Sequence, residues 1–223
     1  AAPDAITSDL MTGLAQHAQK IEDMKVRGAF TFSGRMEQLD DDGKATQVKD
    51  ITMRSTPTGA PRDRIVKVMK YVEDGKDKTS EAQAKADERR AKHKEGKNEK
   101  MSKDLKLPFL ASEQGRYIFS VAERDKSDPT HVRVNFNPKE AAEDAIKGSA
   151  WVDETSKEIL SMGFSLTKNP TFIDHVDITI TFGLPTPMGR APSAVTFDGK
   201  GGFLFIHKHY RGSGTFSDPA AAF

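Results

Sequence analysis

The chain has 223 residues, no cysteine and a formal net charge of +1, from 34 Lys or Arg against 33 Asp or Glu. The lack of cysteine excludes disulfides and thiolate chemistry, and the balanced charge argues against a protein that binds nucleic acid through its phosphates. No apolar run approaches the roughly 20 residues that a membrane-spanning helix needs, and the length fits a single sheet-rich domain over residues 1–223.

The N-terminal segment predicts export and then a helix. The sequence begins AAPDA without Met, which is what remains when a signal peptide is removed at a small-residue site, so we expect a periplasmic or otherwise exported protein. Residues 4–26 carry apolar side chains near helical spacing, with Asp4 or Thr7 as the cap and Gly28 as the stop. The apolar positions are Ile6, Leu10, Leu14, Ile21 and Met24. This pattern predicts an amphipathic helix.

From residue 28 the apolar period changes to two, which is typical of a strand. Residues 28–39 place Phe30, Phe32 and Met36 on one face, and DDDGK at 40–44 is a hairpin turn signal. Residues 48–54 and 65–72 continue as strands on either side of a loop that contains Pro and Gly. We expect an N-terminal meander after the helix.

Residues 73–106 form a charged insertion. Between Val72 and Leu105 there is no Val, Ile, Leu or aromatic residue, and Ser80 with Gln83 resembles a capping box at the start of a helix. The segment is a solvated helix or a disordered excursion, and its mixed charge favours an exposed insertion over an interaction arm for a membrane or an acidic partner. We expect it to be dispensable for folding, because it offers little apolar surface for burial.

Most of the second half reads as antiparallel strands. After an apolar return at 105–110, five runs with alternating apolar residues follow one another with short turns between them. The runs are GRYIFSVAE, THVRVNFNP, the hairpin GSAWVDETSKEILSMGFSL, IDHVDITITFG and GGFLFIHKHYRGSG. In the hairpin the repeat that starts at Leu160 predicts one apolar face, and residues 139–148 are at most a short helix stopped by Gly148.

His207 and His209 are the sharpest chemical signal. Two apart on a strand, they share a face, and His175, Asp174 and Asp177 would supply further metal ligands from a neighbouring strand. No Cys and no well-spaced third and fourth ligand accompany them, so a solvated strand end is favoured and we predict no metal site. Because no GxSxG elbow or phosphate-binding glycine loop is present, we also expect no catalytic residue and no cofactor.

Apolar residues at period two on successive strands predict a continuous surface larger than one amphipathic helix seals. The predicted lining residues of a ligand cavity on this surface are Phe30, Phe32, Met36, Phe119, Phe164, Ile178 and Phe205. The alternative is that these side chains are ordinary core.

The N-terminal helix, the long meander and the segment from GSAWVD through NPTFIDHVDITITFG to GGFLFIHKHYRGSGTFSDP resemble the periplasmic lipoprotein carriers of the LolA, LolB and RseB group. The resemblance implies an α+β fold, in which an unclosed antiparallel half-barrel has helices over its concave face and an apolar cavity for acyl chains. It also implies one LolA-like domain, to which residues 73–106 are an atypical insertion. Arg35 is the candidate for the arginine that locks the lid of these carriers.

Three functions are compatible with these patterns. The leading hypothesis is an exported, non-enzymatic carrier of a lipid, a lipoprotein acyl chain or another apolar ligand. The second is an RseB-like envelope sensor or scaffold that binds a protein partner through the charged insertion. The third is a metal-dependent enzyme that uses the paired His. The expected partner is a lipid or acylated ligand, with envelope proteins or a membrane surface as further partners and no nucleic acid.

Overall fold

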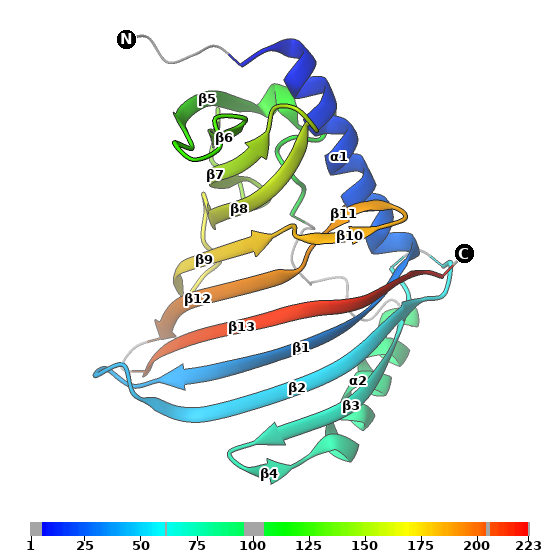
Figure 1. Cartoon of the computed structure of the whole chain (residues 1–223). Coiled ribbons are helices and arrows are strands. Elements are labelled where there is room, and N and C mark those ends of the chain that lie inside the picture. The colour runs from blue at the N-terminus through cyan, green and yellow to red at the C-terminus, as the bar shows by residue number, and fades with distance from the viewer. Residues whose placement is uncertain (1–5, 61, 96–104, 204–205, 223) are drawn as a thin grey trace.

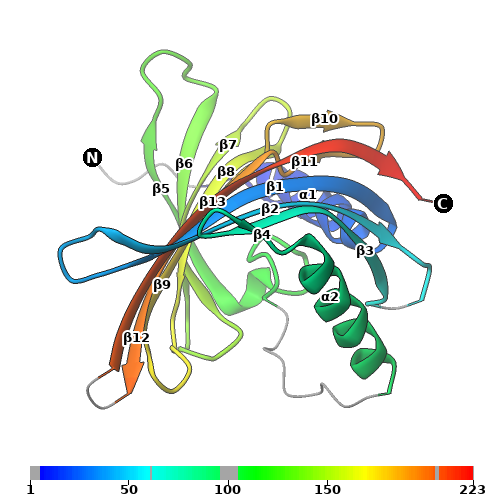
Figure 2. The ribbon, with the colours of Figure 1, turned by 90° about the horizontal axis from the view of Figure 1, so that it is seen from below.

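A large curved antiparallel sheet with helices on its concave side forms the protein (Figures 1 and 2). The computed structural model describes residues 6–60, 62–95, 105–203 and 206–222. In this part of the chain the main sheet has 11 strands in the order β4-β3-β2-β1-β13-β12-β9-β8-β7-β6-β5. Its two ends, β4 and β5, do not pair within the described residues, so the predicted unclosed half-barrel of the α+β class is confirmed.

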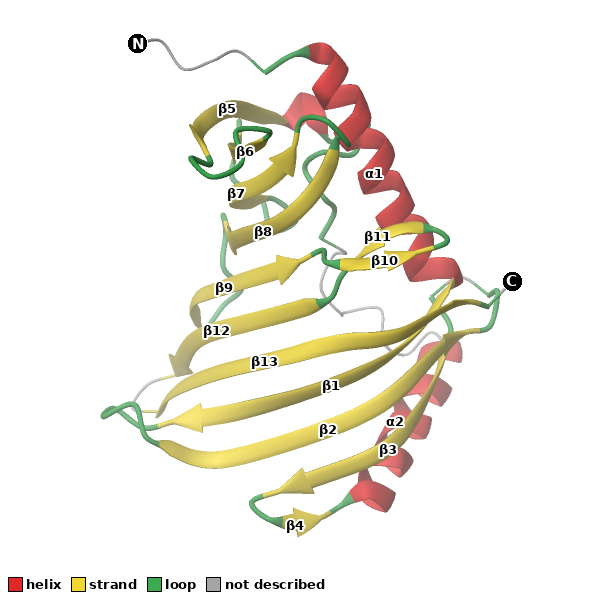
Figure 3. Cartoon of the chain, viewed as in Figure 1, coloured by secondary structure: helices red, strands yellow, loops and turns green. Residues whose placement is uncertain are grey.

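Most strands follow the predicted runs along the chain (Figure 3), but the run GGFLFIHKHYRGSG is divided between the end of β12 and the start of β13, which pair with each other. The strands are β1 (Gly28–Leu39), β2 (Ala45–Pro57), β3 (Arg64–Glu73), β4 (Lys76–Asp77), β5 (Tyr117–Arg124), β6 (His131–Pro138), β7 (Ile146–Asp153), β8 (Glu158–Leu166), β9 (Ile173–Thr181), β12 (Ala194–Phe203) and β13 (Ile206–Ala221). A separate hairpin consists of β10 (Leu184–Thr186) and β11 (Gly189–Ala191), and a short 3-10 helix covers Gln114–Arg116.

The N-terminal helix α1 (Ser8–Arg27) begins and ends as predicted. The hydroxyl of Thr7 accepts a hydrogen bond from the N–H of Leu10 at 3.2 Å, and Gly28 is the C-cap, from which the chain passes directly into β1. The apolar stripe of the helix is buried against the sheet; its fully or nearly fully buried residues are Leu10, Leu14, Ala18 and Ile21. The predicted amphipathic helix is therefore confirmed.

His17 fastens α1 to two other elements. Its Nδ1 accepts a hydrogen bond from the backbone N–H of Ile159 in β8 at 2.8 Å, and its Nε2 donates to the carbonyl oxygen of Arg190 in β11 at 2.9 Å. This pattern fits the neutral imidazole with its proton on Nε2. The side chain is 4% exposed, and burial lowers the pKa of His17 below its usual value.

The second helix, α2 (Thr79–Lys94), lies within the predicted insertion and packs along the edge strand β3 (Figure 1). The side-chain amide of Gln83 accepts a hydrogen bond from the N–H of Val68 at 2.6 Å and donates to the carbonyl of Val66 at 3.0 Å. These bonds satisfy groups of the edge strand that would otherwise be open to another strand. The side chain of Gln83 thus forms hydrogen bonds with the edge strand that a further strand would otherwise form.

The predicted capping box of Ser80 and Gln83 is wrong. The helix begins at Thr79 with Lys78 in the N-cap position; the side chain of Lys78 makes no capping bond, and the carboxylate of Asp77 accepts a hydrogen bond from the N–H of Thr79 at 2.9 Å. Gln83 is occupied by strand β3 instead, so the pattern that resembled a cap is a docking contact. No residue of α2 is buried, in keeping with a segment that lacks large apolar side chains.

The predicted role of Gly148 as a helix stop is also wrong. Residues 139–145 are turns and irregular structure, and Gly148 lies inside β7. A Cβ at this position would collide with the carbonyl oxygen of Gly163 on the neighbouring strand β8. Close approach of two strands therefore explains the glycine.

A bulge changes the predicted face of the β7–β8 hairpin. The register between these strands shifts between Trp151 and Val152, so Val152 pairs with Ile159. Ile159 is fully buried, whereas Leu160, the predicted start of the apolar face, is only half-buried. An extra residue in one strand reverses the side-chain alternation beyond it, and the period-two pattern does not show where this happens.

The core lies at one end of the sheet. Strands β5 to β8 bury their concave side chains beneath α1 and the segment that returns at 105–110, as predicted for that apolar run. Phe109 stacks on Phe119 with ring centroids 5.3 Å apart and meets Phe136 edge-on at 6.0 Å. The concave face of the sheet continues beyond this cluster, where it is formed by strands β1 to β3, β9, β12 and β13. We call these two regions the filled half and the open half.

Candidate functional site

Two rows of directly paired residues run across the concave face through both halves. Paired residues of neighbouring strands point to the same side of a sheet, so each row is a continuous line of side chains. The first row is Phe119, Phe136, Gly148, Phe164, Ile178, Phe197, Gly212, Met36, Lys49 and Glu73. The second is Val121, Val134, Ala150, Met162, Ile180, Val195, Gly214, Gly34, Ile51 and Tyr71.

Glycines keep the floor of the open half low. A Cβ at Gly34 would lie 2.8 Å from ring atoms of Phe32, and a Cβ at Gly214 would overlap the same ring. The ring therefore lies flat over the two glycines, with its centroid 5.2 Å from that of Phe216. In the same way, a Cβ at Gly199 would lie 2.8 Å from the ring of Phe197. Flat rings over glycines make an apolar surface without filling the space above it.

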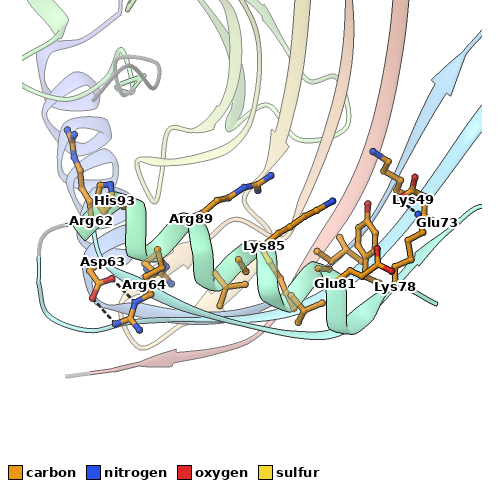
Figure 4. A pocket seen from close by; sticks show the side chains of 18 residues that line it. Lys49, Arg62, Asp63, Arg64, Glu73, Lys78, Glu81, Lys85, Arg89 and His93 are labelled. Atoms are coloured by element: carbon orange, nitrogen blue, oxygen red, sulfur yellow. Dashed lines mark hydrogen bonds and ion pairs between the residues drawn. The ribbon is translucent and has the colours of Figure 1, made fainter. Parts of the chain in front are cut away.

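Three adjacent cavities follow this floor. The largest, about 650 Å³, lies between α2 and strands β2 and β3 (Figure 4). A cavity of about 280 Å³ over β1, β12 and β13 shares Lys49, Ile51 and Tyr71 with it. A third, of about 340 Å³, lies near the β12–β13 turn and shares Phe197 with the second. We call the three cavities the trough.

The trough has the dimensions of a site for an extended apolar chain. It crosses six strands, which at a strand spacing of about 4.8 Å corresponds to a length of about 24 Å. One acyl chain of a lipid fills half of the hydrocarbon core of a bilayer, or about 15 Å. The open half can therefore hold such a chain along its length.

The structure distributes the predicted cavity residues over both halves. Phe119, Phe164, Ile178 and Met36 share the first row, which spans nearly the whole sheet. Phe119 and Phe164 pack against the core of the filled half. Phe32 and Met36 line the trough, and Met36 is 45% exposed.

Phe30 lies beside the trough, and Arg35 borders its middle cavity. The ring of Phe30 contacts Phe216 with centroids 5.4 Å apart and lies beneath the guanidinium of Arg64 at 5.0 Å. Arg35 alternates with the trough residues of β1 and forms two hydrogen bonds to Asp50, at 2.7 and 3.0 Å. This pairing raises the pKa of Arg35 and lowers the pKa of Asp50. Phe205 lies outside the described residues.

Sequence reasoning missed several trough residues. Ile51, Tyr71 and Phe197 line it, and Ile51 lies where the two cavities nearest α2 meet. The alternation of Val195, Phe197 and Gly199 is a usable strand signal, but the glycines that follow Phe197 indicate a turn more strongly than a strand.

An acidic residue in the β2–β3 connection holds α2 in place. Asp63 is 7% exposed and accepts hydrogen bonds from Arg90 of α2 at 2.9 and 3.0 Å and from the hydroxyl of Thr58 at 2.8 Å. The hydrogen bonds from Arg90, and then the bond from Thr58, hold the pKa of Asp63 well below its usual range. A bidentate pair of this kind fixes the helix above the trough.

His207 and His209, the predicted pair, do not share a common partner. His209 and His175 share the carboxylate of Asp198 through their Nε2 atoms, at 2.9 and 3.0 Å, and His207 takes no part in this contact. The hydrogen bond from His209, and then the bond from His175, lower the pKa of Asp198. Asp198 and Phe197 alternate along β12, so the Asp198 carboxylate lies on the sheet face opposite the trough, although His175 also borders the cavity near the β12–β13 turn. Among the described residues, no group of three or more acidic or histidine side chains is arranged to hold a metal ion.

No protein-family model and no curated protein matches this sequence. A LolA superfamily protein from Nitrosomonas europaea has a similar structure, with 9% identity over 97% of this chain and 94% of that chain and a TM-score of 0.44. A DUF1329 family protein from Desulfovibrio piger shows 9% identity over 96% and 94%, with a TM-score of 0.41. The MucA/MucB complex of Pseudomonas aeruginosa shows 9% identity over 97% and 100%, with a TM-score of 0.25.

All three alignments extend over most of this chain, but their TM-scores are below 0.5. The functional conclusion therefore rests on the residues of this chain. Neither helix that the structure describes is long and apolar enough to cross a membrane.

Proposed function

We propose that this chain is a non-enzymatic binding protein that carries the apolar chain of a lipid, a lipoprotein acyl group or a similar amphiphile in the trough. The observation that carries the proposal is the apolar floor of the open half, above which helix α2 leaves an unfilled cavity of about 650 Å³. Ligand sites have volumes of this order and are lined mostly by apolar side chains.

A carrier role explains two otherwise costly features. Met36 is 45% exposed in the middle of a sheet face, and the glycines beneath the ring of Phe32 give up side chains that would fill the space. A bound apolar chain would cover the exposed side chain of Met36 and would occupy the space that these glycines leave open. Transfer of an acyl chain through water requires such a cover, so export to the periplasm or a similar compartment between membranes belongs to the proposal.

The test is displacement of a fluorescent fatty acid, measured beside thermal unfolding. Ile51→Asn on the trough floor should weaken probe binding about tenfold, because the polar side chain removes roughly 1.5 kcal/mol of apolar contact with the ligand. The matched control is Ile65→Asn, on the opposite face of β3, where Ile65 is 48% exposed. We expect this control to bind the probe like the parent protein, and both variants to unfold near the parent temperature.

Absence of probe binding by the parent protein would overturn the proposal and favour an envelope sensor or scaffold with a protein partner. Native mass spectrometry of protein purified without detergent gives an independent measurement, since a carrier retains lipid. Unfolding of Ile51→Asn without a specific loss of affinity would identify Ile51 as a core residue.

A further inference from the structure

Helix α2 covers the trough with a stripe of short and basic side chains. The residues that face the largest cavity recur at helical spacing and include Ala82, Lys85, Ala86 and Arg89. The two alanines are too short to reach the sheet, which leaves the cavity open beneath the helix. Figure 4 shows Lys85 and Arg89 extending from α2 toward the space inside the curved sheet, while Lys49 projects from β2 at the far end of the cavity.

The basic residues elsewhere on α2 have acidic partners. Arg90 pairs with Asp63 at 2.9 Å, and Lys92 pairs with Glu88 at 2.5 Å. Lys94 lies 4.0 Å from the same Asp63. These three cations of α2 therefore have acidic partners within the chain, including Arg90, which also lines the largest cavity.

Three other cations that line the largest cavity differ in this respect. Within the described residues, the side chains of Lys49, Lys85 and Arg89 make neither a hydrogen bond nor an ion pair. Of the three acids that line the cavity, Asp63 is bound to Arg90 and Glu73 pairs with Lys78 at 3.6 Å, which leaves Glu81. The mouth of an apolar cavity therefore carries an excess of positive charge without a partner in the chain.

We propose that Lys85 and Arg89 of α2, together with Lys49 of β2, bind the anionic headgroup of the amphiphile whose apolar chain lies in the trough. We call these three residues the cationic lip. The inference rests on the proposed function and specifies its ligand class, an amphiphile with a phosphate or carboxylate beside its chain. A guanidinium and two ammonium groups suit such oxygens, because both donate charge-assisted hydrogen bonds to them.

The experiment uses three palmitoyl amphiphiles that share one chain: neutral monopalmitoyl glycerol, zwitterionic lysophosphatidylcholine and anionic lysophosphatidylglycerol. We expect the parent protein to bind the anionic ligand about fivefold to tenfold more tightly than the neutral one, as two or three partly exposed charge contacts allow. Raising NaCl from about 50 to about 500 mM should reduce this preference, because salt screens exposed charges.

A pair of double variants locates the effect. Lys85→Gln with Arg89→Gln should remove the preference and leave the affinity for monopalmitoyl glycerol unchanged. The control, Lys92→Gln with Lys94→Gln, removes the same charge from the same helix but away from the cavity, and it should keep the preference.

The outcomes distinguish the proposed carrier function from the proposed role of the cationic lip. Binding of neither amphiphile by the parent protein contradicts the carrier function itself. Equal affinity for neutral and anionic ligands, or equal loss of preference in both double variants, overturns the cationic lip and leaves the carrier function standing. Inorganic phosphate is titrated alone as a further arm. Tight phosphate binding that disappears in the Lys85 and Arg89 variant would identify a site for a free anion and overturn the headgroup assignment.

Discussion

The filled and open halves share one sheet and the same cross-strand rows, yet they differ in what covers them. In the filled half, eight residues of strands β6 to β8 are at most 1% exposed: Val132, Val134, Phe136, Ile146, Ala150, Val152, Ile159 and Met162. In the open half the first row continues to Met36, which is 45% exposed. Alternation along a strand therefore predicts which side chains share a face but leaves open whether that face becomes core or binding surface.

The helices account for the difference. α1 faces the sheet with Leu10, Leu14 and Ile21, which fill the space above β5 to β8 together with Phe109. α2 faces the sheet with Ala82 and Ala86, and it is held by polar contacts of Gln83 and Arg90. A helix that docks through hydrogen bonds can cover a site without filling it.

The largest expected effect is a difference in stability between two variants, each of which truncates one phenylalanine, in the filled half or in the open half. Phe136→Ala in the filled half should lower the free energy of unfolding by about 3 to 5 kcal/mol, because it leaves a cavity in packed core. Phe32→Ala in the trough should lower it by less than about 1.5 kcal/mol, because that ring already borders open space. Urea denaturation measures both. Similar losses would show that the trough is closed in solution.

His17 tests how firmly the filled half depends on α1. His17→Ala leaves the N–H of Ile159 and the carbonyl of Arg190 without their partner, so a loss of about 2 to 3 kcal/mol is expected. The control is His131→Ala, at a half-exposed imidazole near Asp128, which should change stability little.

The same residue predicts a pH dependence. Burial lowers the pKa of His17 in the folded protein, so the unfolded chain binds the proton more readily. Stability should therefore fall as the pH drops below about 6.5, the ordinary pKa of histidine. In His17→Ala this part of the pH dependence should be absent. An unchanged pH profile would contradict the assignment.

A smaller effect on stability, with a large effect on binding, is expected when the trough is filled. In Gly214→Val the new side chain displaces the ring of Phe32 upward, which should cost about 1 kcal/mol of stability and weaken fatty-acid binding more than about tenfold. Gly163→Val is the matched control, since a Cβ there meets only the hydroxyl of Thr179 at 3.6 Å. Unchanged probe affinity in Gly214→Val would place the ligand elsewhere.

The smallest expected effect is on folding when the insertion is removed. Replacement of residues 73–106 by a short Gly and Ser linker should leave the melting temperature nearly unchanged, because α2 buries no side chain. The hydrogen bonds of Gln83 to the edge strand set the modest loss that we do expect, about 1 kcal/mol. Loss of cooperative unfolding would show that α2 is part of the folding unit.

Local patterns predicted most of the elements and less of the site. The cap at Thr7 and the strand that contains Phe30 and Phe32 depend on neighbouring residues, and both were predictable. The bulge at Leu160 depends on how β8 pairs with β7, and the docking of Gln83 depends on its contact with strand β3. The division into filled and open halves also depends on distant segments, since it is set by which helix lies over which strands.

The pairing of β1 with β13 has a consequence for the order of folding. Strands β5 to β8 are joined by short connections, so their contacts close small loops and form early. The floor of the trough instead needs Gly28–Leu39 to meet Ile206–Ala221, across nearly the whole chain. A nascent or translocating chain thus completes the filled half first, and it acquires an apolar groove only when its last strand arrives and the rest is already packed.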